Sequence, residues 1–384
     1  MNNLWLLVAC VLLSSATAVQ AICPLVIAHR GASGERPEHT LAAYQLAIEQ
    51  GADFIEVDLV PTRDGVLIAR HENALALVAL QPDGTITRVD GAPVITEATT
   101  NVATKPEFSD RLTVKVIDGR PMGGWFSEDF TIAEIKTLRA RERMPAVRPA
   151  NTAYNDQFEV PTFTQVLELA RAGTTGVYPE LKHYTYFMNE ALSTTGQPIR
   201  NDTLLLLIRD LLAADFEDPA RLFIQSFEVE PLLRLRALAE AEETPHWPRV
   251  QLAGTPEGIP YDLVARAKSG TLDGLSALFA VYGGAPRVMT YGELLAEPAK
   301  LKTSHADAVG PAYQALLADR ALGPRLQQAG LAIHAYTLRQ EAVFLPDQMS
   351  LPALSAELRR LGVGGVFTDN VPQVRDAMAG CRED

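Results

Sequence analysis

Short apolar runs alternate with helical patterns along most of the chain, and this alternation limits the fold more than any other feature of the sequence. Eight runs have the length and composition of buried strands. They end near His29, Asp58, Glu180, Phe227, Ala253, Gly310, Thr337 and Asp369. Eight strands with helices between them are typical of a (β/α)8 TIM barrel, which carries its chemistry at the C-terminal strand ends. The sequence therefore predicts this α/β fold.

Helical patterns follow these runs, with apolar residues on one face of each. We expect helices over 40–50, 163–172, 202–215, 230–242, 313–328, 351–361 and 372–378. A turn at 63–65 predicts that 66–70 folds back on the preceding strand as a hairpin.

Two stretches fit the barrel pattern less well. We expect about 73–160 to be an irregular insertion with one helix, Ile132–Arg141. Such insertions commonly cover an active site and set substrate size. The glycine-rich segment 254–302 is expected to be a second, smaller elaboration over the site.

The composition limits the domain organisation and the partners. The 384 residues are 47% hydrophobic, which is enough for one barrel with additions or for two domains. The formal net charge of −13 argues against a nucleic-acid surface and against an anionic membrane surface. It does not exclude a phosphate-bearing substrate, because a metal ion and an arginine make one pocket locally positive.

Residues 1–21 are typical of a secretory signal peptide. They carry no charged side chain, and their apolar run, 4–13, is short for a membrane span. We expect cleavage after Ala21 and a single mature domain, 22–384, in the periplasm or outside the cell, without stable membrane insertion. The alternatives are an uncleaved anchor and a lipoprotein box ending at Cys10, but apolar residues continue past that cysteine.

Two cysteines, Cys23 and Cys381, stand at the ends of this mature chain. The first strand and the last helix of a closed barrel are neighbours. An oxidising compartment therefore permits a disulfide between them. The alternative is two unrelated thiols.

The stretch 26–72 gathers reactive side chains at predicted strand ends. Glu56 and Asp58 share one side of a strand, because strand residues alternate faces. Paired carboxylates suit a hard divalent cation. His29 and His71 suit proton transfer near neutral pH, and Arg30 suits a phosphate. Each feature alone also fits a solvated or structural strand end, but their combination favours a functional site, because unpaired buried polar groups are costly.

Short motifs over nearly the whole mature chain resemble one known family. They are His29-Arg30-Gly31-Ala32, Pro37-Glu38-His39-Thr40, Glu56-Val57-Asp58-Leu59, Thr62-Arg63-Asp64-Gly65, His71-Glu72, Tyr178-Pro179-Glu180-Leu181-Lys182, Ala308-Val309-Gly310-Pro311, His334-Ala335-Tyr336-Thr337 and Phe367-Thr368-Asp369. The joint pattern resembles the glycerophosphodiester phosphodiesterase family, in particular its periplasmic bacterial type. The resemblance implies a TIM barrel of the phospholipase C-like kind. It also implies hydrolysis of glycerophosphodiesters, such as glycerophosphocholine or glycerophosphoethanolamine, to sn-glycerol 3-phosphate and an alcohol.

The resemblance also implies roles for individual residues. These are metal ligation by Glu56, Asp58 and Glu180, acid–base catalysis by His29 and His71, and phosphate binding by Arg30 and Lys182. Three carboxylates suit Ca²⁺ or Mg²⁺; for Glu180 the alternative is a salt bridge to Lys182. The sequence does not say which histidine is the base. It also leaves open whether water or the substrate's own glycerol hydroxyl attacks.

Other residues have weaker assignments. Phe227 and Tyr336 lie at strand ends and either wall the glycerol pocket or pack at the barrel rim. His39 is expected to be structural, through a cap or loop hydrogen bond, and His334 to be packed in the core. His183 stays unassigned.

The sequence departs from the family pattern in two places. Glu72 stands where the family more often has aspartate, which keeps the carboxylate. The segment 75–94 is an extra piece, which bears on substrate range more than on the reaction.

Two further hypotheses stay open. A barrel of the phospholipase D or sphingomyelinase type, acting on intact phospholipids, would need an apolar lip or a basic patch, and the sequence shows neither clearly. A periplasmic binding protein for phosphorylated solutes would share the signal and the size. It would need no paired histidines beside a carboxylate site, and it would show two similar lobes.

Overall fold

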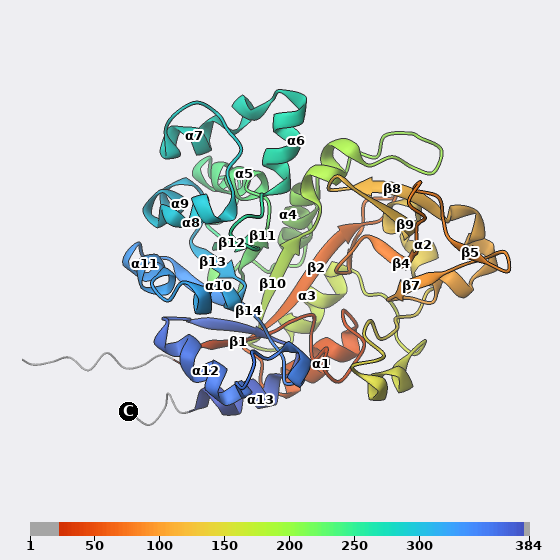
Figure 1. Cartoon of the computed structure of the whole chain (residues 1–384), viewed down its shortest axis with the longest axis horizontal. Coiled ribbons are helices and arrows are strands. Elements are labelled where there is room, and N and C mark those ends of the chain that lie inside the picture. The colour runs from red at the N-terminus through yellow and green to blue at the C-terminus, as the bar shows by residue number, and fades with distance from the viewer. Residues whose placement is uncertain (1–22, 380–384) are drawn as a thin grey trace, which may run out of the picture.

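A closed barrel forms the centre of the computed structural model, which describes residues 23–379. The first strand pairs in parallel with both the second and the last, which closes the sheet. In spatial order the barrel strands are β1 (Leu25–Ala28), β2 (Phe54–Pro61), β10 (Gly176–Leu181), β11 (Ile224–Ser226), β12 (Arg249–Ala253), β13 (Ala308–Pro311), β14 (Ala332–Leu338) and β15 (Gly365–Thr368). The predicted (β/α)8 barrel is confirmed (Figure 1).

The register between β2 and β10 sets the position of the acidic residues. Asp58 lies opposite Glu180, and Glu56 lies opposite Tyr178. Because strand side chains alternate faces, this register places the three carboxylates on one side of the sheet. The predicted hairpin is also present, since β3 (Leu67–Ala69) pairs antiparallel with β2.

Aromatic rings fill part of the barrel interior. Tyr178 stacks on Phe223 with ring centroids 5.1 Å apart and meets Phe367 edge to face at 5.0 Å. His334 joins this cluster, and its Nδ1 lies 2.8 Å from the Tyr178 hydroxyl. The expected core role of His334 is confirmed.

Helices surround the barrel close to the predicted positions. They are α1 (Leu41–Glu49), α3 (Phe163–Arg171), α4 (Thr203–Ala213), α5 (Glu230–Glu240), α10 (Tyr313–Ala318), α11 (Leu322–Gln328), α12 (Leu351–Arg360) and α13 (Val371–Met378). The single helix expected over 313–328 is wrong, because α10 and α11 divide it. Pro324 in the middle of one helix would clash with the preceding turn, whereas in α11 it falls within the first turn.

The insertion is more regular than expected. Its strands β4 (Ala74–Val78), β7 (Ile95–Ala98), β8 (Thr113–Ile117) and β9 (Arg120–Phe126) form an antiparallel sheet in the order β7-β4-β9-β8, and β5 (Arg88–Val89) pairs with β6 (Ala92–Pro93). Figure 1 shows this sheet to the right of the barrel. The sheet buries its own apolar cluster, which includes Phe108, Trp125 and Phe130.

The helix predicted at Ile132–Arg141 is correspondingly too long. α2 (Ile132–Ile135) ends after one turn, although Thr131 and Glu134 form a complete capping box at its start. The following residues form a turn and then irregular chain up to Ala140. Ala140 bridges Thr100, so pairing with the rest of the insertion overrides the local helical pattern.

The segment 254–302 is helical and lies beside the barrel. It contains α6 (Tyr261–Ser269), α7 (Ser276–Tyr282), α8 (Tyr291–Ala296) and α9 (Pro298–Ser304). None of its residues lines the main cavity described below, but Tyr291 packs on the cavity-lining Phe227, with ring centroids 6.3 Å apart. Among residues 23–379, no helix combines the length and the apolar character that crossing a bilayer requires. The signal prediction and Cys381 fall outside the described residues.

Candidate active site

A cavity of ≈ 640 Å³ opens where the barrel strands end. All the residues that the sequence assigned to the site line it: His29, Arg30, Glu56, Asp58, His71, Glu180, Lys182, Phe227 and Tyr336. They come from β2, β10 and β14 and from the segments that follow β1, β3, β10 and β11. Closure of the barrel therefore brings together residues that lie up to about 300 positions apart in the chain.

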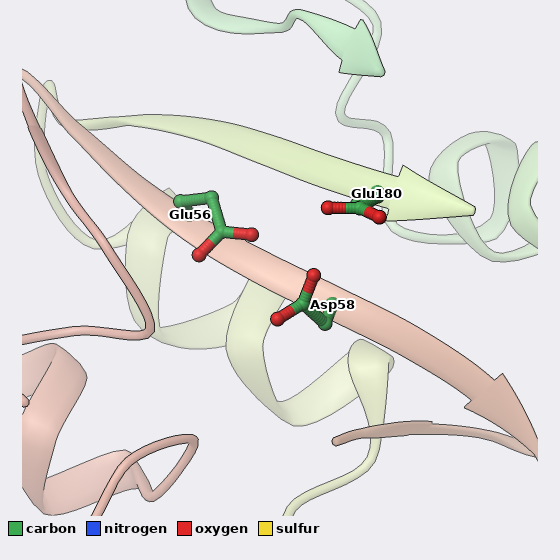
Figure 2. A group of neighbouring side chains, drawn as sticks. All are labelled: Glu56, Asp58 and Glu180. Atoms are coloured by element: carbon green, nitrogen blue, oxygen red, sulfur yellow. The ribbon is translucent and has the colours of Figure 1, made fainter. Parts of the chain in front are cut away.

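Three carboxylates form a compact acidic cluster in this cavity. Glu56, Asp58 and Glu180 each offer an oxygen within 4.8 Å of the others, and all three are buried (Figure 2). The amide of Gln225 donates to Glu56 at 3.3 Å and leaves its own buried oxygen without a partner. Buried oxygen ligands without sulfur or imidazole suit a hard cation such as Ca²⁺ or Mg²⁺.

The electrostatics of the cluster also fit a bound cation. Burial and the two neighbouring carboxylates raise the pKa of Glu56 well above its ordinary value. Burial, opposed by Lys182 and reinforced by Asp58, raises the pKa of Glu180 to about 8. Without a cation, part of the cluster therefore holds protons at neutral pH, and a divalent ion would replace them.

His39 holds one of these carboxylates in place. Its Nε2 donates to Asp58 Oδ2 at 2.9 Å, and its Nδ1 accepts from the Tyr44 hydroxyl at 2.7 Å. Burial lowers the pKa of His39 to about 4, so the ring is neutral and carries one proton. The cap or loop hydrogen bond predicted for His39 is therefore wrong: the ring instead bonds a carboxylate of the acidic cluster and fixes its orientation.

A carboxylate orients the first predicted catalytic histidine. His29 Nδ1 lies 2.6 Å from Asp369 Oδ1, at the end of β15. Asp369 Oδ2 accepts from Arg148 and Arg339, each at 2.6 Å. Because the carboxylate accepts, Nδ1 of His29 carries the proton and Nε2 keeps its lone pair. Burial and the charge of Arg30 lower the pKa of His29 to about 4, so the free ring is neutral.

The second histidine also lies beside a carboxylate. His71 Nδ1 is 2.9 Å from Glu72 Oε1, but without hydrogen-bond geometry, so this buried nitrogen has no hydrogen-bond partner. Burial, together with Arg30 and Lys182, holds the pKa of His71 well below its ordinary value. The replacement of the family's aspartate by Glu72 thus keeps a carboxylate beside the ring.

Arg30 combines a strained backbone with a buried charge. Its φ of 60° lies in the left-handed region, which costs a non-glycine residue on the order of 1 kcal/mol. This conformation lets its amide donate to Glu56 Oε2 at 2.8 Å. Its guanidinium pairs with Glu38 at 2.9 Å, while its buried Nε has no hydrogen-bond partner and lies 3.5 Å from Asp58.

Lys182 lies against the carboxylate cluster. Its ammonium is 2.8 Å from Glu180 and 3.8 Å from Asp58. The salt bridge that was the alternative role for Glu180 is therefore present, within the same acidic cluster. Arg30 and Lys182 place two cations beside the cavity, where an anionic substrate would lie.

Apolar and aromatic side chains form the rest of the cavity wall. The rings of Phe227 and Tyr336 lie 6.0 Å apart, and the Tyr336 hydroxyl donates to the Ala253 carbonyl at 2.9 Å. Both residues therefore line the cavity and pack at the rim. The remaining apolar and aromatic lining consists of Leu252, Tyr313, Leu317, Val343, Phe344, Leu345, Pro346 and Phe367. Among the described residues that line the cavity, the cluster carboxylates are the only acids.

Sequence reasoning missed several residues of the site. Glu38 and Asp369 stood inside the quoted motifs, so their position in those motifs was the available signal. Gln225, Arg148 and Arg339 lie outside them. Arg148 in particular belongs to the insertion, in which no motif singled out an individual residue.

The fold and the site together define a class of protein. A closed (β/α)8 barrel with an acidic cluster that could hold a cation, two histidines beside carboxylates and two buried cations fits metal-assisted acid–base chemistry on an anionic substrate. The model of the glycerophosphoryl diester phosphodiesterase family matches residues 29–373. The chain belongs to this family.

Individual relatives agree with this assignment. A glycerophosphodiester phosphodiesterase of Arabidopsis thaliana is 29% identical, over 91% of this chain and 85% of the relative. One from Bacillus subtilis (strain 168) is 27% identical, over 90% and 83%.

Solved structures share the fold. An Oleispira antarctica phosphodiesterase in complex with the product sn-glycerol-3-phosphate matches with a TM-score of 0.54, 19% identity and coverage of 93% of this chain and 97% of the other. A glycerophosphodiester phosphodiesterase from Agrobacterium tumefaciens str. C58 matches with a TM-score of 0.51, 19% identity and coverage of 92% and 99%.

Proposed function

We propose that this chain is a metal-dependent glycerophosphodiester phosphodiesterase, which hydrolyses glycerophosphodiesters to sn-glycerol 3-phosphate and an alcohol. The observation that carries the proposal is one cavity that holds the carboxylate cluster, His29 and His71. Membership of the family supports the substrate class.

Glu56, Asp58 and Glu180 are proposed to hold the cation, Ca²⁺ or Mg²⁺. When bound, such an ion supplies positive charge that neutralises the phosphate and stabilises the charge of the transition state. Arg30 and Lys182 are proposed to bind the phosphate oxygens, which would give the unpartnered Arg30 Nε an acceptor.

The histidines are proposed to move the protons. One ring takes the proton of the attacking oxygen at Nε2, the atom that its carboxylate partner leaves free. The other gives a proton to the oxygen of the leaving alcohol. Both rings of the free protein are neutral, and the substrate's negative charge raises the pKa of the ring that must donate. A substrate analogue without the glycerol hydroxyl next to the phosphate separates the two routes, because its turnover requires attack by water.

The apolar wall of the cavity bears on which leaving alcohol the site prefers. The Arg339 guanidinium lies 4.7 Å from the centre of the Phe344 ring, and the Lys182 ammonium lies 5.8 Å from that of Phe227. These rings are already paired with the protein's own cations, so they offer little to a quaternary ammonium group. We therefore propose that uncharged alcohols, including aliphatic ones, are preferred over choline.

A second candidate, action on intact phospholipids, is favoured by one observation. Val343 is 71% exposed beside the cavity-lining Phe344, Leu345 and Pro346, which makes a short apolar lip that the sequence did not reveal. The net charge of −13 opposes binding to anionic membranes. Turnover of phospholipid vesicles at rates comparable to glycerophosphodiesters would favour this candidate.

Export to the periplasm or beyond is proposed from residues 1–21, and a disulfide from Cys23 and Cys381. In support of the disulfide, Cys23 and Ala379 line the same small cavity between β1 and α13. Ala379 precedes the second cysteine by two residues. The mass of the exported protein before and after reduction and alkylation tests both proposals. Retention of residues 1–21 in the exported protein would contradict the first proposal. The same number of alkylated cysteines with and without reduction would contradict the second.

The proposed reaction is tested by release of sn-glycerol 3-phosphate from glycerophosphoglycerol and glycerophosphocholine by the purified mature chain. Assays with Ca²⁺, with Mg²⁺ and with a chelator are compared, beside His29→Gln and Glu56→Gln. We expect metal-dependent turnover that both substitutions abolish. Tight ligand binding without turnover, in a folded and metal-loaded protein, would favour the solute-binding hypothesis instead.

A further inference from the structure

A hairpin of the insertion reaches the second catalytic histidine. The β8–β9 turn consists of Asp118 and Gly119, both with positive φ. Asp118 Oδ2 lies 2.7 Å from His183 Nδ1, and His183 Nε2 lies 3.1 Å from Glu72 Oε2. Glu72 Oε1 lies 2.9 Å from His71 Nδ1. A continuous chain of side chains therefore connects the hairpin tip to His71.

The geometry fixes the charge of His183. Each of its ring nitrogens faces a carboxylate, and only a doubly protonated imidazolium can donate to both. Although burial opposes it, Asp118 and Glu72 raise the pKa of His183 to about 10. A fixed cation thus holds one oxygen of Glu72 and leaves the other 2.9 Å from His71 Nδ1, an atom that has no hydrogen-bond partner in the free protein.

The hairpin cannot easily drift from this position. Lys115 on β8 pairs with Glu128 at 2.9 Å and with Asp129 at 2.8 Å, and both carboxylates are buried. A methyl group added at Gly119 would sit 3.5 Å from the ring of Tyr261 on α6, so the tip packs against the helical segment 254–302.

The insertion also reaches the first catalytic histidine. Arg148, whose side chain is 5% exposed, donates to Asp369 at 2.6 Å, to Glu341 at 2.6 Å and to the Ser33 carbonyl at 2.9 Å. Asp369 is the carboxylate that holds His29.

None of the described residues of the insertion lines the main cavity. In chain order, the next lining residue after His71 is Glu180. A smaller neighbouring cavity, however, is lined by Arg143, Met144 and Arg148 of the insertion together with His29 and Arg30. The insertion therefore borders the site beside His29 and also reaches it through the buried contacts of His183 and Arg148.

We propose that the insertion positions both catalytic histidines: Asp118 and His183 hold Glu72 against His71, and Arg148 holds Asp369 against His29. The proposal rests on the proposed function, because it assigns the histidines their proton-transfer role. The supporting side chains are positioning residues, which act through the histidines.

The test compares Asp118→Asn and His183→Asn with a matched control. Asparagine tolerates the left-handed backbone at both positions, so the folds should survive. Asp90→Asn changes another Asp-Gly turn of the insertion, in which both residues likewise have positive φ but the aspartate is exposed. We expect kcat to fall about 10- to 100-fold in each test variant, with KM and metal binding unchanged, and no effect in the control.

The double variant sharpens this test. Both residues act along one path, so combining them should cost little more than the worse single change. In Asp118→Asn the alkaline limb of the kcat profile should move to lower pH, because His183 then faces only one carboxylate, Glu72. Wild-type kcat in Asp118→Asn and His183→Asn would overturn the proposal. Arg148→Lys, which keeps the charge but loses the planar fork, should lower kcat through His29, and unchanged kcat there would refute that half.

Nitrogen NMR of the histidine rings keeps the proposal separate from the reaction. We expect His183 to stay doubly protonated at about pH 8 and His71 to carry its proton on Nδ1, with both signals altered in Asp118→Asn. An inactive wild type with these signals would reject the proposed function alone. Signals of a neutral His183 would reject the positioning role alone.

Discussion

The metal-free acidic cluster should destabilise the folded protein as the pH rises, and a bound cation should relieve this destabilisation. Comparison with Glu180→Gln measures the contribution of one carboxylate. Burial raises the pKa of Glu180 from 4.5 to about 8. Below about pH 4.5 the group is protonated in both the folded and the unfolded chain. Between the two pKa values the unfolded chain releases the proton and the folded chain keeps it, so the metal-free protein loses stability as the pH rises.

The size of the effect depends on the shift. Each pKa unit corresponds to about 1.4 kcal/mol, so the whole rise corresponds to at most about 5 kcal/mol. Between about pH 5.5 and about pH 8 the contribution changes by about 3 kcal/mol. Glutamine cannot ionise, so Glu180→Gln removes this term. A cation at the cluster compensates for it in the wild type.

The assay is urea unfolding in the presence of a chelator at both pH values. We expect the free energy of unfolding of the wild type, relative to Glu180→Gln, to fall by about 3 kcal/mol from the lower to the higher pH. Glu168→Gln, on the exposed side of α3, serves as a control and should show no such change. A wild-type difference that stays constant with pH would refute the reasoning, since Lys182 would then already neutralise the cluster.

His29→Gln and His71→Gln should each lower kcat at least about 100-fold without changing Ca²⁺ binding in calorimetry, because the rings transfer protons and do not ligate the ion; loss of metal binding would contradict this. Asp369→Asn should lower kcat at least about 10-fold, because an amide can donate to Nδ1 of His29 and favour the wrong tautomer; wild-type kcat would argue against orientation by Asp369. Leu345→Asp should lower kcat/KM for a glycerophosphodiester with an octyl alcohol but not for glycerophosphoglycerol. Buried methylenes are worth about 0.8 kcal/mol each, so equal losses for both substrates would reject the apolar alcohol site.

The fold could be predicted from the sequence because each barrel strand and helix has a local pattern. β1, β2 and β10 are short, buried apolar runs, and turns or helix caps mark where each of them ends. The errors arose where distant contacts decide the structure. α2 ends after Ile135 because Ala140 pairs with Thr100, and the irregular stretch around it becomes a sheet only when β4 pairs with β9.

The residues of the candidate site could likewise be identified only in part from the sequence. Glu56 and Asp58 could be recognised by their spacing, because two residues along a strand share a face. Their partner Glu180 could be named only through a motif, since its place opposite Asp58 comes from the parallel register of β2 and β10.

By itself, the sequence determined the barrel and the residue types of the site, because periodicity and strand-end chemistry are local properties. Only the tertiary structure decided which of the site's side chains pair with each other. The carboxylate of Asp369 meets His29 across the closure of the barrel, and Asp118 meets His183 across 65 residues of chain. Those pairings depend on how the insertion packs on the barrel, and no local pattern encodes that packing. The tertiary structure thus connects the insertion, through Arg148 and through Asp118 and His183, to the carboxylates beside His29 and His71.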